Sequence, residues 1–277
     1  MRAAAIQLNA NNDKDRNLEL AERLVATAAG EGAELVALPE KWNLLGPGEE
    51  IGAGAEQLED ARSFNAARGW ARRHRIHLLA GSVSERVPGS ERPFNTSVLF
   101  DPDGDAVAIY RKIHMFDVDV GGVAYRESEH EQPGEEIVTG NAAGVEIGLS
   151  VCYDLRFPEL YRILALRGAR VLTVPAAFTH PTGRAHWELL VRARAIENQA
   201  HVVAPNQCGQ APPHYHSYGH SMIVGPWGEV LARADEQVGV IVAELDLERQ
   251  DELRESLPSL ANRRPRAYRW PEGAAVR

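Results

Sequence analysis

The chain has 277 residues, of which 44% are hydrophobic and 25% are charged, and its net charge is −9 at pH 7. This composition is typical of folded domains and excludes intrinsic disorder as the main state, and the acidic balance disfavours nucleic acid or an anionic membrane as a partner. Because it has no apolar run near the ~20 residues of a membrane span, and its two cysteines are too few for a disulfide framework, we expect a cytoplasmic protein with no membrane partner.

Short apolar strands and helices alternate through the first half. Segment 13–29 has apolar residues at helical spacing, and Gly30 and Gly32 end it. The turn signal Asp101-Pro102-Asp103-Gly104 predicts a β-hairpin between the apolar runs on either side. The predicted strands are 2–8, 34–38, 76–83, 95–100 and 106–111, and the predicted helices are 13–29 and 57–75.

The second half repeats this alternation. Its longest predicted helix is 185–199, and a Pro226-Trp227-Gly228 turn joins two strands near the end of the chain. The predicted strands are 145–151, 170–174, 201–205, 221–224, 230–234 and 238–244, and the predicted helices are 158–167, 185–199 and 246–254.

This order of elements predicts an α/β fold. Helices that alternate with apolar strands indicate sheets covered by helices, and the hairpins indicate that the sheets are mixed. So many strands suit two sheets stacked face to face, with helices outside, better than one open sheet. Because no linker or shift in composition divides the chain, we predict a single domain over residues 1–277, with a C-terminal tail from about residue 255.

Three reactive side chains follow predicted strands directly. Glu40 follows the strand at 34–38, Lys112 follows that at 106–111, and Cys152 follows that at 145–151. In α/β sheets, ligands collect beyond the carboxyl ends of the strands. One charged residue there can simply mark where a strand reaches water, but three complementary groups in equivalent positions favour a catalytic site.

Cys152 is the residue best suited to be a nucleophile. Pro158 and Glu159 are typical of the first turn of a helix, so Cys152 is predicted to lie in a strand-to-helix turn. The backbone N–H groups of such a turn favour a thiolate and can hold an oxyanion. Glu40 is the expected base and Lys112 the expected cation beside it.

Two other segments receive simpler interpretations. Cys208 is followed by no helix start, so we interpret it as packing or as pocket lining. The glycine-rich segment 46–54 is interpreted as a flexible loop beside Glu40 that could cover the site.

Histidines offer a competing interpretation. A zinc hydrolase needs three protein ligands and an open position, but the spacing of the histidines matches no familiar metal motif. The histidines concerned are His180, His186, His214, His216 and His220. We therefore predict no metal, and the metal-dependent hydrolase stays an alternative.

Taken together, three segments resemble the nitrilase superfamily of carbon–nitrogen hydrolases. They are Leu38-Pro39-Glu40, 110–117 (Tyr-Arg-Lys-Ile-His-Met-Phe-Asp) and 148–159 (Gly-Leu-Ser-Val-Cys-Tyr-Asp-Leu-Arg-Phe-Pro-Glu). The resemblance implies a four-layer αββα sandwich, a homodimer or higher homo-oligomer, and no cofactor. It also implies that Cys152 is the nucleophile, Glu40 the general base and then acid, and Lys112 the oxyanion stabiliser, with Glu127 of Tyr125-Arg126-Glu127-Ser128 as a second glutamate.

Segments 176–179, 182–188, 192–199 and 218–222 resemble, within the superfamily, the Nit branch of ω-amidases, and Gln207-Cys208-Gly209 resembles members that hydrolyse deaminated glutathione. This resemblance implies a small-molecule amide substrate, the ω-amide of a small carboxylic or 2-oxo acid such as deaminated glutathione or 2-oxoglutaramate. The residues expected to bind it are Tyr153, whose N–H would hold the oxyanion, Phe178, Thr179 and two candidates for the substrate carboxylate, Arg156 and Arg184. The sequence departs from the branch at Lys41, where a Cys or Gly often follows the glutamate.

Other functions remain open on the sequence. The site would also suit an N-carbamoyl compound or a nitrile, and the fold could persist as a non-catalytic scaffold. Carbon dioxide release would mark the carbamoyl substrate, and rapid alkylation of Cys152 over Cys208 would argue against the scaffold.

Overall fold

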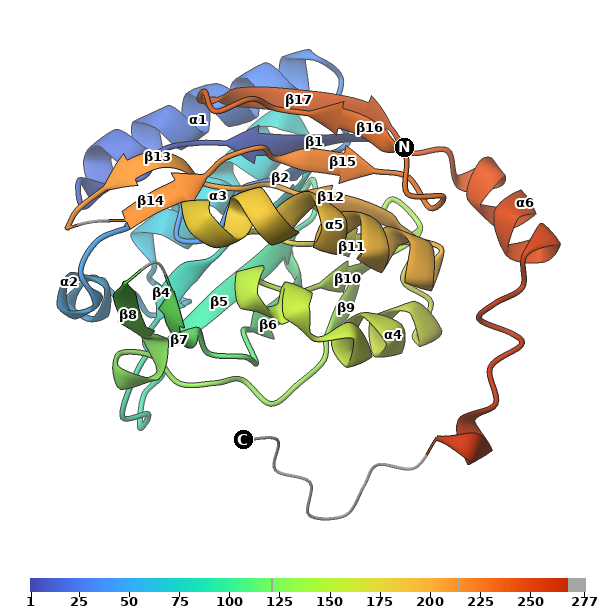
Figure 1. Ribbon diagram of the computed structural model, residues 1–277. Helices are drawn as coiled ribbons and strands as arrows, with labels where there is room; N and C mark the ends of the chain where they lie inside the picture. Colours follow the sequence, from blue (N-terminus) through green and yellow to red (C-terminus); the bar gives the residue numbers. More distant parts are fainter. Residues whose placement is uncertain (121, 214, 269–277) are drawn as a thin grey trace.

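Two mixed β-sheets form the centre of the protein (Figure 1), whose computed structural model describes residues 1–120, 122–213 and 215–268. The first sheet has seven strands, and β1 pairs in parallel with β2 and antiparallel with β17. In spatial order it contains β17 (Gly239–Glu244), β1 (Arg2–Gln7), β2 (Leu35–Ala37), β3 (His77–Leu79), β5 (Phe94–Phe100) and β4 (Val83–Glu85), with β6 (Ala106–Arg111) also paired to β5.

The second sheet has six strands, with parallel pairing at its centre and antiparallel pairing at both edges. In spatial order it contains β16 (Val230–Arg233), β15 (Met222–Val224), β12 (His201–Ala204), β11 (Val171–Thr173), β10 (Val145–Leu149) and β9 (Thr139–Ala142).

Helices cover the outer face of each sheet. Helices α1 (Lys14–Gly30) and α3 (Arg62–His74) pack on the first sheet, and α4 (Pro158–Leu166) and α5 (His180–Asn198) pack on the second (Figure 1). The layers are therefore helices, sheet, sheet and helices, and the predicted αββα sandwich is confirmed.

Alternation along the strands explains why the layers stack in this way. In β1, Ala3 and Ala5 belong to the core cluster that reaches the second sheet, whereas Ala4 and Ile6 belong to the cluster beneath α1 and α3. Successive side chains of a strand point to opposite faces, so a strand covered on both faces needs apolar residues at every position. This requirement explains the uninterrupted apolar run at the start of the chain.

Shorter elements surround the sandwich. Helix α2 (Gly48–Ala53) follows β2, and α6 (Leu247–Ser256) and a 3₁₀ turn, η3 (Pro265–Ala267), follow β17. Two small hairpins are made by β7 (Asp117–Val120) with β8 (Val123–Arg126), and by β13 (Cys208–Ala211) with β14 (Tyr215–Tyr218). Within the described residues, no helix combines the length and the apolar character needed to cross a membrane.

Several predicted boundaries are wrong for local reasons. The helix predicted from residue 57 begins at Arg62, and the Glu56 carboxylate accepts from the Ser63 N–H of its first turn at 2.8 Å. The helix predicted from residue 185 begins at His180, since Pro181 is tolerated in the first turn.

Two predicted segments differ in kind from what the structure contains. The strand predicted at 76–83 divides into β3 and β4 at Gly81, whose φ of +41° and contact with the Pro39 carbonyl leave no room for a Cβ. The segment 46–54, predicted to be a flexible loop, contains α2.

Candidate active site

Glu40, Lys112 and Cys152 lie around one cavity of about 360 Å³. Glu40 follows β2 and Lys112 follows β6, both in the first sheet, whereas Cys152 follows β10 of the second sheet. Stacking the two sheets therefore brings these strand ends together. All three side chains are buried, so their charges interact in a medium that screens them less than water does.

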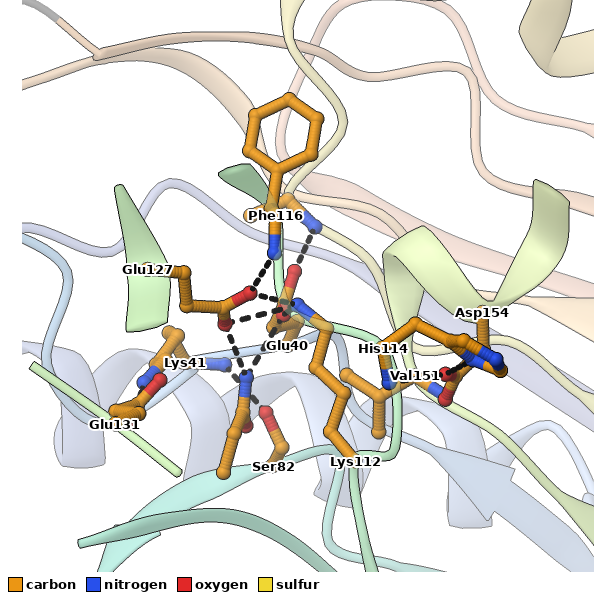
Figure 2. Close-up of polar contacts among 12 residues, drawn as sticks. Glu40, Lys41, Ser82, Lys112, His114, Phe116, Glu127, Glu131, Val151 and Asp154 are labelled. Carbon is orange, nitrogen blue, oxygen red and sulfur yellow. Dashed lines mark hydrogen bonds and ion pairs between the residues drawn. The ribbon is translucent and has the colours of Figure 1, made fainter. Parts of the chain in front are cut away.

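Lys112 is at the centre of the charged groups (Figure 2). Its Nζ lies 3.0 Å from Glu40 Oε1 and 2.8 Å from each carboxylate oxygen of Glu127. Burial alone would lower the pKa of Lys112, but the negative charges of Glu127 and Glu40 reverse the shift and raise that pKa. Lys112 is therefore a fixed ammonium held between two carboxylates.

The Glu40 carboxylate is held on both of its oxygens. Oε1 accepts from Asn95 Nδ2 at 2.9 Å as well as from Lys112, and Oε2 accepts from the Ala177 N–H at 2.9 Å. The backbone carbonyl of Glu40 accepts from Gln207 Nε2 at 2.9 Å. These contacts, from both sheets and their loops, fix the direction of the carboxylate.

Glu127 completes the group. Besides the bonds from Lys112, it accepts from the Phe116 N–H at 2.7 Å. Burial would raise the pKa of Glu127, but the charges of Lys112 and Lys41 and these hydrogen bonds outweigh it and lower the pKa to about 2. Glu127 is therefore a permanent anion that holds Lys112 in position.

Cys152 lies in a tight backbone turn. It begins a 3₁₀ turn, η2 (Cys152–Arg156), and its φ of +48° lies in the left-handed region that most residues avoid. Its N–H donates to the carbonyl of Pro175 at 2.8 Å, whereas α4 begins only at Pro158. Cys152 therefore lies in the turn between β10 and α4, as the sequence predicts, and it lines the cavity.

A buried carboxylate, Asp154, holds this turn from behind. It accepts from the Val151 N–H at 2.8 Å, the Tyr110 hydroxyl at 2.6 Å and the His114 N–H at 3.2 Å, and its Oδ1 lies 2.7 Å from His114 Nδ1. These contacts tie the turn to β6 and to the segment after Lys112. Asp154 is not among the site residues predicted from the sequence, although a carboxylate two residues after a candidate nucleophile is a visible signal.

The surroundings of Cys152 shift the pKa of its thiol in both directions. Burial, the negative charge of Glu40 and a hydrogen bond with that carboxylate raise the pKa of the Cys152 thiol, and Lys112 and the Ala177 N–H oppose this only in part. The sequence predicts that the N–H groups of the turn favour a thiolate, and burial beside Glu40 acts in the opposite direction. Proton transfer to a neighbouring base is therefore needed for Cys152 to act as a nucleophile.

The cavity wall includes some of the predicted binding residues. Tyr153, Phe178 and Thr179 line it, whereas Arg156 and Arg184 are not among its lining residues. Arg156 lies over the Tyr153 and Phe178 rings, 5.9 and 5.2 Å from their centroids, and Arg184 is exposed on α5. Lining residues that sequence reasoning missed include Ile51 of α2, Tyr125 of the β7–β8 hairpin and Tyr215 of β14, together with Lys41 in the turn after β2.

The histidines are arranged differently from a metal site. The described residues contain no group of three or more His, Cys, Asp or Glu side chains placed to hold a metal ion. His180 and His216 stack with ring centroids 4.3 Å apart, and His214 of the predicted cluster lies outside the described residues.

Known proteins resemble this chain along nearly its whole length. The sequence matches the carbon-nitrogen hydrolase family over residues 2–255. It is 41% identical over 271 residues to deaminated glutathione amidase of Synechocystis sp., covering 94% of this chain and 97% of the relative. It is 37% identical over 270 residues to omega-amidase NIT2 of Homo sapiens, covering 96% of each. The crystal structure of Nit3 from Saccharomyces cerevisiae, a member of branch 10 of the nitrilase superfamily, matches with a TM-score of 0.87 at 32% identity over 97% of each chain.

Proposed function

The chain belongs to the carbon–nitrogen hydrolase family, and from this premise we propose that it is a cysteine-dependent amidase for the terminal amide of a small carboxylic or 2-oxo acid. The names of the relatives support this substrate class, and deaminated glutathione and 2-oxoglutaramate are its expected members. The observation that carries the proposal is the common cavity of Cys152, Glu40 and Lys112.

In the first stage, Cys152 Sγ attacks the amide carbonyl while Glu40 accepts the thiol proton. A thiol whose pKa is raised by burial and by Glu40 needs this transfer during the attack. Lys112 Nζ and the Tyr153 N–H stabilise the oxyanion. Glu40 then gives the proton to the leaving nitrogen, the C–N bond breaks, and ammonia departs from a thioester on Cys152.

In the second stage, Glu40 removes a proton from water, which attacks the thioester carbonyl. The C–S bond breaks, the carboxylic acid leaves, and the proton returns to the Cys152 sulfur. Glu127, an anion with a pKa of about 2, keeps Lys112 in position through both stages. Of the two carboxylates beside Lys112, Glu40 therefore exchanges protons and Glu127 stays charged.

Ammonia release by the purified protein tests this function. The panel contains ω-amides of small acids, carbamoyl amino acids and nitriles, each scored for ammonia, with carbon dioxide scored for the carbamoyl compounds. We expect the ω-amides to give the highest kcat/KM. A preference for carbamoyl compounds or nitriles would contradict the proposed substrate class, and no turnover of any compound would contradict an amidase.

We also propose that the protein is a cytoplasmic homodimer. Its two cysteines are free and buried, which fits a reducing compartment. Apolar side chains are exposed on the outer helices, among them Leu166 of α4 at 48% and Leu189 of α5 at 68%, and burying them against a second copy would stabilise an assembly. Light scattering during size exclusion would give twice the mass of the chain, and a monomer would contradict the assembly.

A further inference from the structure

A second ion pair lines the cavity beside the one that holds Glu40. Lys41 follows Glu40 directly, its side chain is 7% exposed, and its Nζ forms an ion pair with Glu131 Oε1. Figure 2 shows the Lys41 side chain reaching Glu131 next to the Glu127 carboxylate. Both partners belong to the cavity wall, and the reaction steps above use neither of them.

Lys41 differs from the other cations of the described wall in how it is bonded. Lys112 has three short contacts to two carboxylates. Arg126 donates twice to Asp119, at 2.8 and 3.0 Å, and to two backbone carbonyls. Within the described residues, Glu131 is the one hydrogen-bond acceptor of Lys41 Nζ. Since an ammonium carries three N–H donors, Lys41 retains donors that a ligand in the cavity can use.

Glu131 holds the Lys41 ammonium at the wall. Its Oε1 also accepts from the Ser84 hydroxyl at 2.9 Å, so the pair is tied to β4. Burial and the nearby charge of Glu127 raise the pKa of Glu131, although Lys41 and Ser84 oppose them. The Lys41–Glu131 ion pair thus joins the segment that carries Glu40 to the segment that carries Glu127.

We propose that Lys41 binds the carboxylate at the far end of the substrate and so selects anionic amides. This inference rests on the proposed function, in which the substrate is the ω-amide of a carboxylic acid. Lys41 replaces Arg156 and Arg184, the cations that the sequence suggests for this role. It is a specificity residue, because its ammonium contacts the substrate away from the reacting carbonyl.

The variant Lys41→Gly tests this role with little effect on the backbone. Lys41 has a φ of +53°, and glycine adopts this left-handed conformation without strain. Two substrates separate recognition from chemistry: glutaramate, which carries a carboxylate, and pentanamide, a neutral amide with the same number of carbons. A hydrogen bond to a charged group is worth about 10- to 100-fold in affinity. We therefore expect the ratio of kcat/KM for glutaramate over pentanamide to fall by about 10- to 100-fold, mainly through the KM for glutaramate.

Two further variants make the test specific. Glu131→Gln removes the carboxylate that competes for Lys41, so the KM for glutaramate should stay the same or fall. Arg249→Gln, at an exposed position on α6, changes the net charge as Lys41→Gly does and should leave the ratio unchanged. Lys41→Gly leaves Glu131 without its partner, which can lower the melting temperature. The double variant Lys41→Gly with Glu131→Gln removes both charges, and it should still lower the kcat/KM ratio of glutaramate over pentanamide.

Several results would overturn the inference. If Lys41→Gly leaves the kcat/KM ratio of glutaramate over pentanamide unchanged, another group binds the carboxylate. A lower ratio in Arg156→Gln or Arg184→Gln would then identify that group. If Lys41→Gly lowers kcat/KM equally for both amides, the Lys41–Glu131 ion pair supports the catalytic loops and does not bind the carboxylate. Wild-type protein that hydrolyses pentanamide without preferring glutaramate would defeat this inference alone, whereas wild-type protein that hydrolyses neither would defeat the proposed function with it.

Discussion

The surroundings of the two cysteines differ far more than the cysteines themselves. Cys152 is 8% exposed and Cys208 is 3% exposed, and neither is in a disulfide. Burial raises the pKa of both thiols, and that of Cys208 rises to about 11, with a smaller contribution from Asp235. By acidity alone, neither sulfur would be a nucleophile at neutral pH.

The neighbours create the difference. Cys152 occupies a left-handed turn and faces Glu40 and Lys112 across the cavity, whereas Cys208 begins β13, and its backbone groups bond to Leu8 and Asn9. A base that receives the proton during attack makes a weakly acidic thiol useful. In the proposed mechanism, Glu40 supplies this base for Cys152, and the described contacts of Cys208 include no counterpart.

The largest expected effect is the difference in turnover between variants that lack one cysteine or the other. Cys152→Ala should reduce turnover to below a hundredth of wild type, because no other group forms the thioester, while the melting temperature stays close to wild type. Cys208→Ala should keep kcat within about twofold, although its small core cavity lowers stability by about 1 kcal/mol. Ammonia release and thermal melting measure both effects. A residual rate above a hundredth in Cys152→Ala would remove that residue as nucleophile.

Removing the cation beside Cys152 should have the next largest effect. Lys112→Ala deletes an oxyanion donor, which costs about 10²- to 10³-fold in kcat. It also leaves two buried carboxylates without their partner, so the free energy of unfolding should fall by about 3 kcal/mol or more. Single-turnover kinetics and urea unfolding measure the two losses. An unchanged kcat would exclude Lys112 from the reaction.

The support behind the Cys152 turn should matter less. Asp154→Asn weakens the bonds to Val151 and Tyr110, and we expect kcat to fall about tenfold while KM stays unchanged, with about 2 kcal/mol lost in stability. Asn9→Ala is the matched control at the other cysteine, since it deletes the 2.7 Å bond to the Cys208 carbonyl. It should leave kcat unchanged. A stability loss without any change in kcat for Asp154→Asn would make Asp154 purely structural.

The smallest expected effect is a change in the pKa of the Cys152 thiol when Glu40 is replaced. Because the charge of Glu40 and its hydrogen bond raise the pKa of Cys152, Glu40→Gln should lower that pKa even though it abolishes turnover. Thiolate absorbance measured against pH, with the Cys152→Ala variant as blank, follows this change. In wild type the thiolate should form only at strongly alkaline pH, and in Glu40→Gln it should form earlier. A higher pKa in the variant would contradict the assigned contact.

Residues of the site differ in how far the sequence could predict them. Glu40, Lys112 and Cys152 end strands whose apolar runs are evident, and a parallel or mixed sheet brings such ends to one edge. The sequence also resembles a known family at all three positions. The strand alternation and the turn at Asp101–Gly104 likewise predicted the sandwich and the β5–β6 hairpin.

The remaining parts of the site depend on contacts between distant segments. Lys41 and Asp154 are charged residues within loops and turns, and their partners Glu131 and Tyr110 lie many residues away. Helix α2 is short and flanked by glycines, so no periodic pattern marks it. The raised pKa of Cys152 follows from its burial beside Glu40, which the position of a strand end does not reveal.

The central claim is that an acyl group passes through a thioester on Cys152. Acid quenching during turnover of an ω-amide, followed by intact-mass and peptide mass spectrometry, tests it most directly. We expect wild-type protein to gain the mass of the acyl group on the peptide that carries Cys152, with no gain in Cys152→Ala or on the peptide that carries Cys208. Rapid ammonia release without any adduct at Cys152, or an adduct at Cys208, would contradict this account.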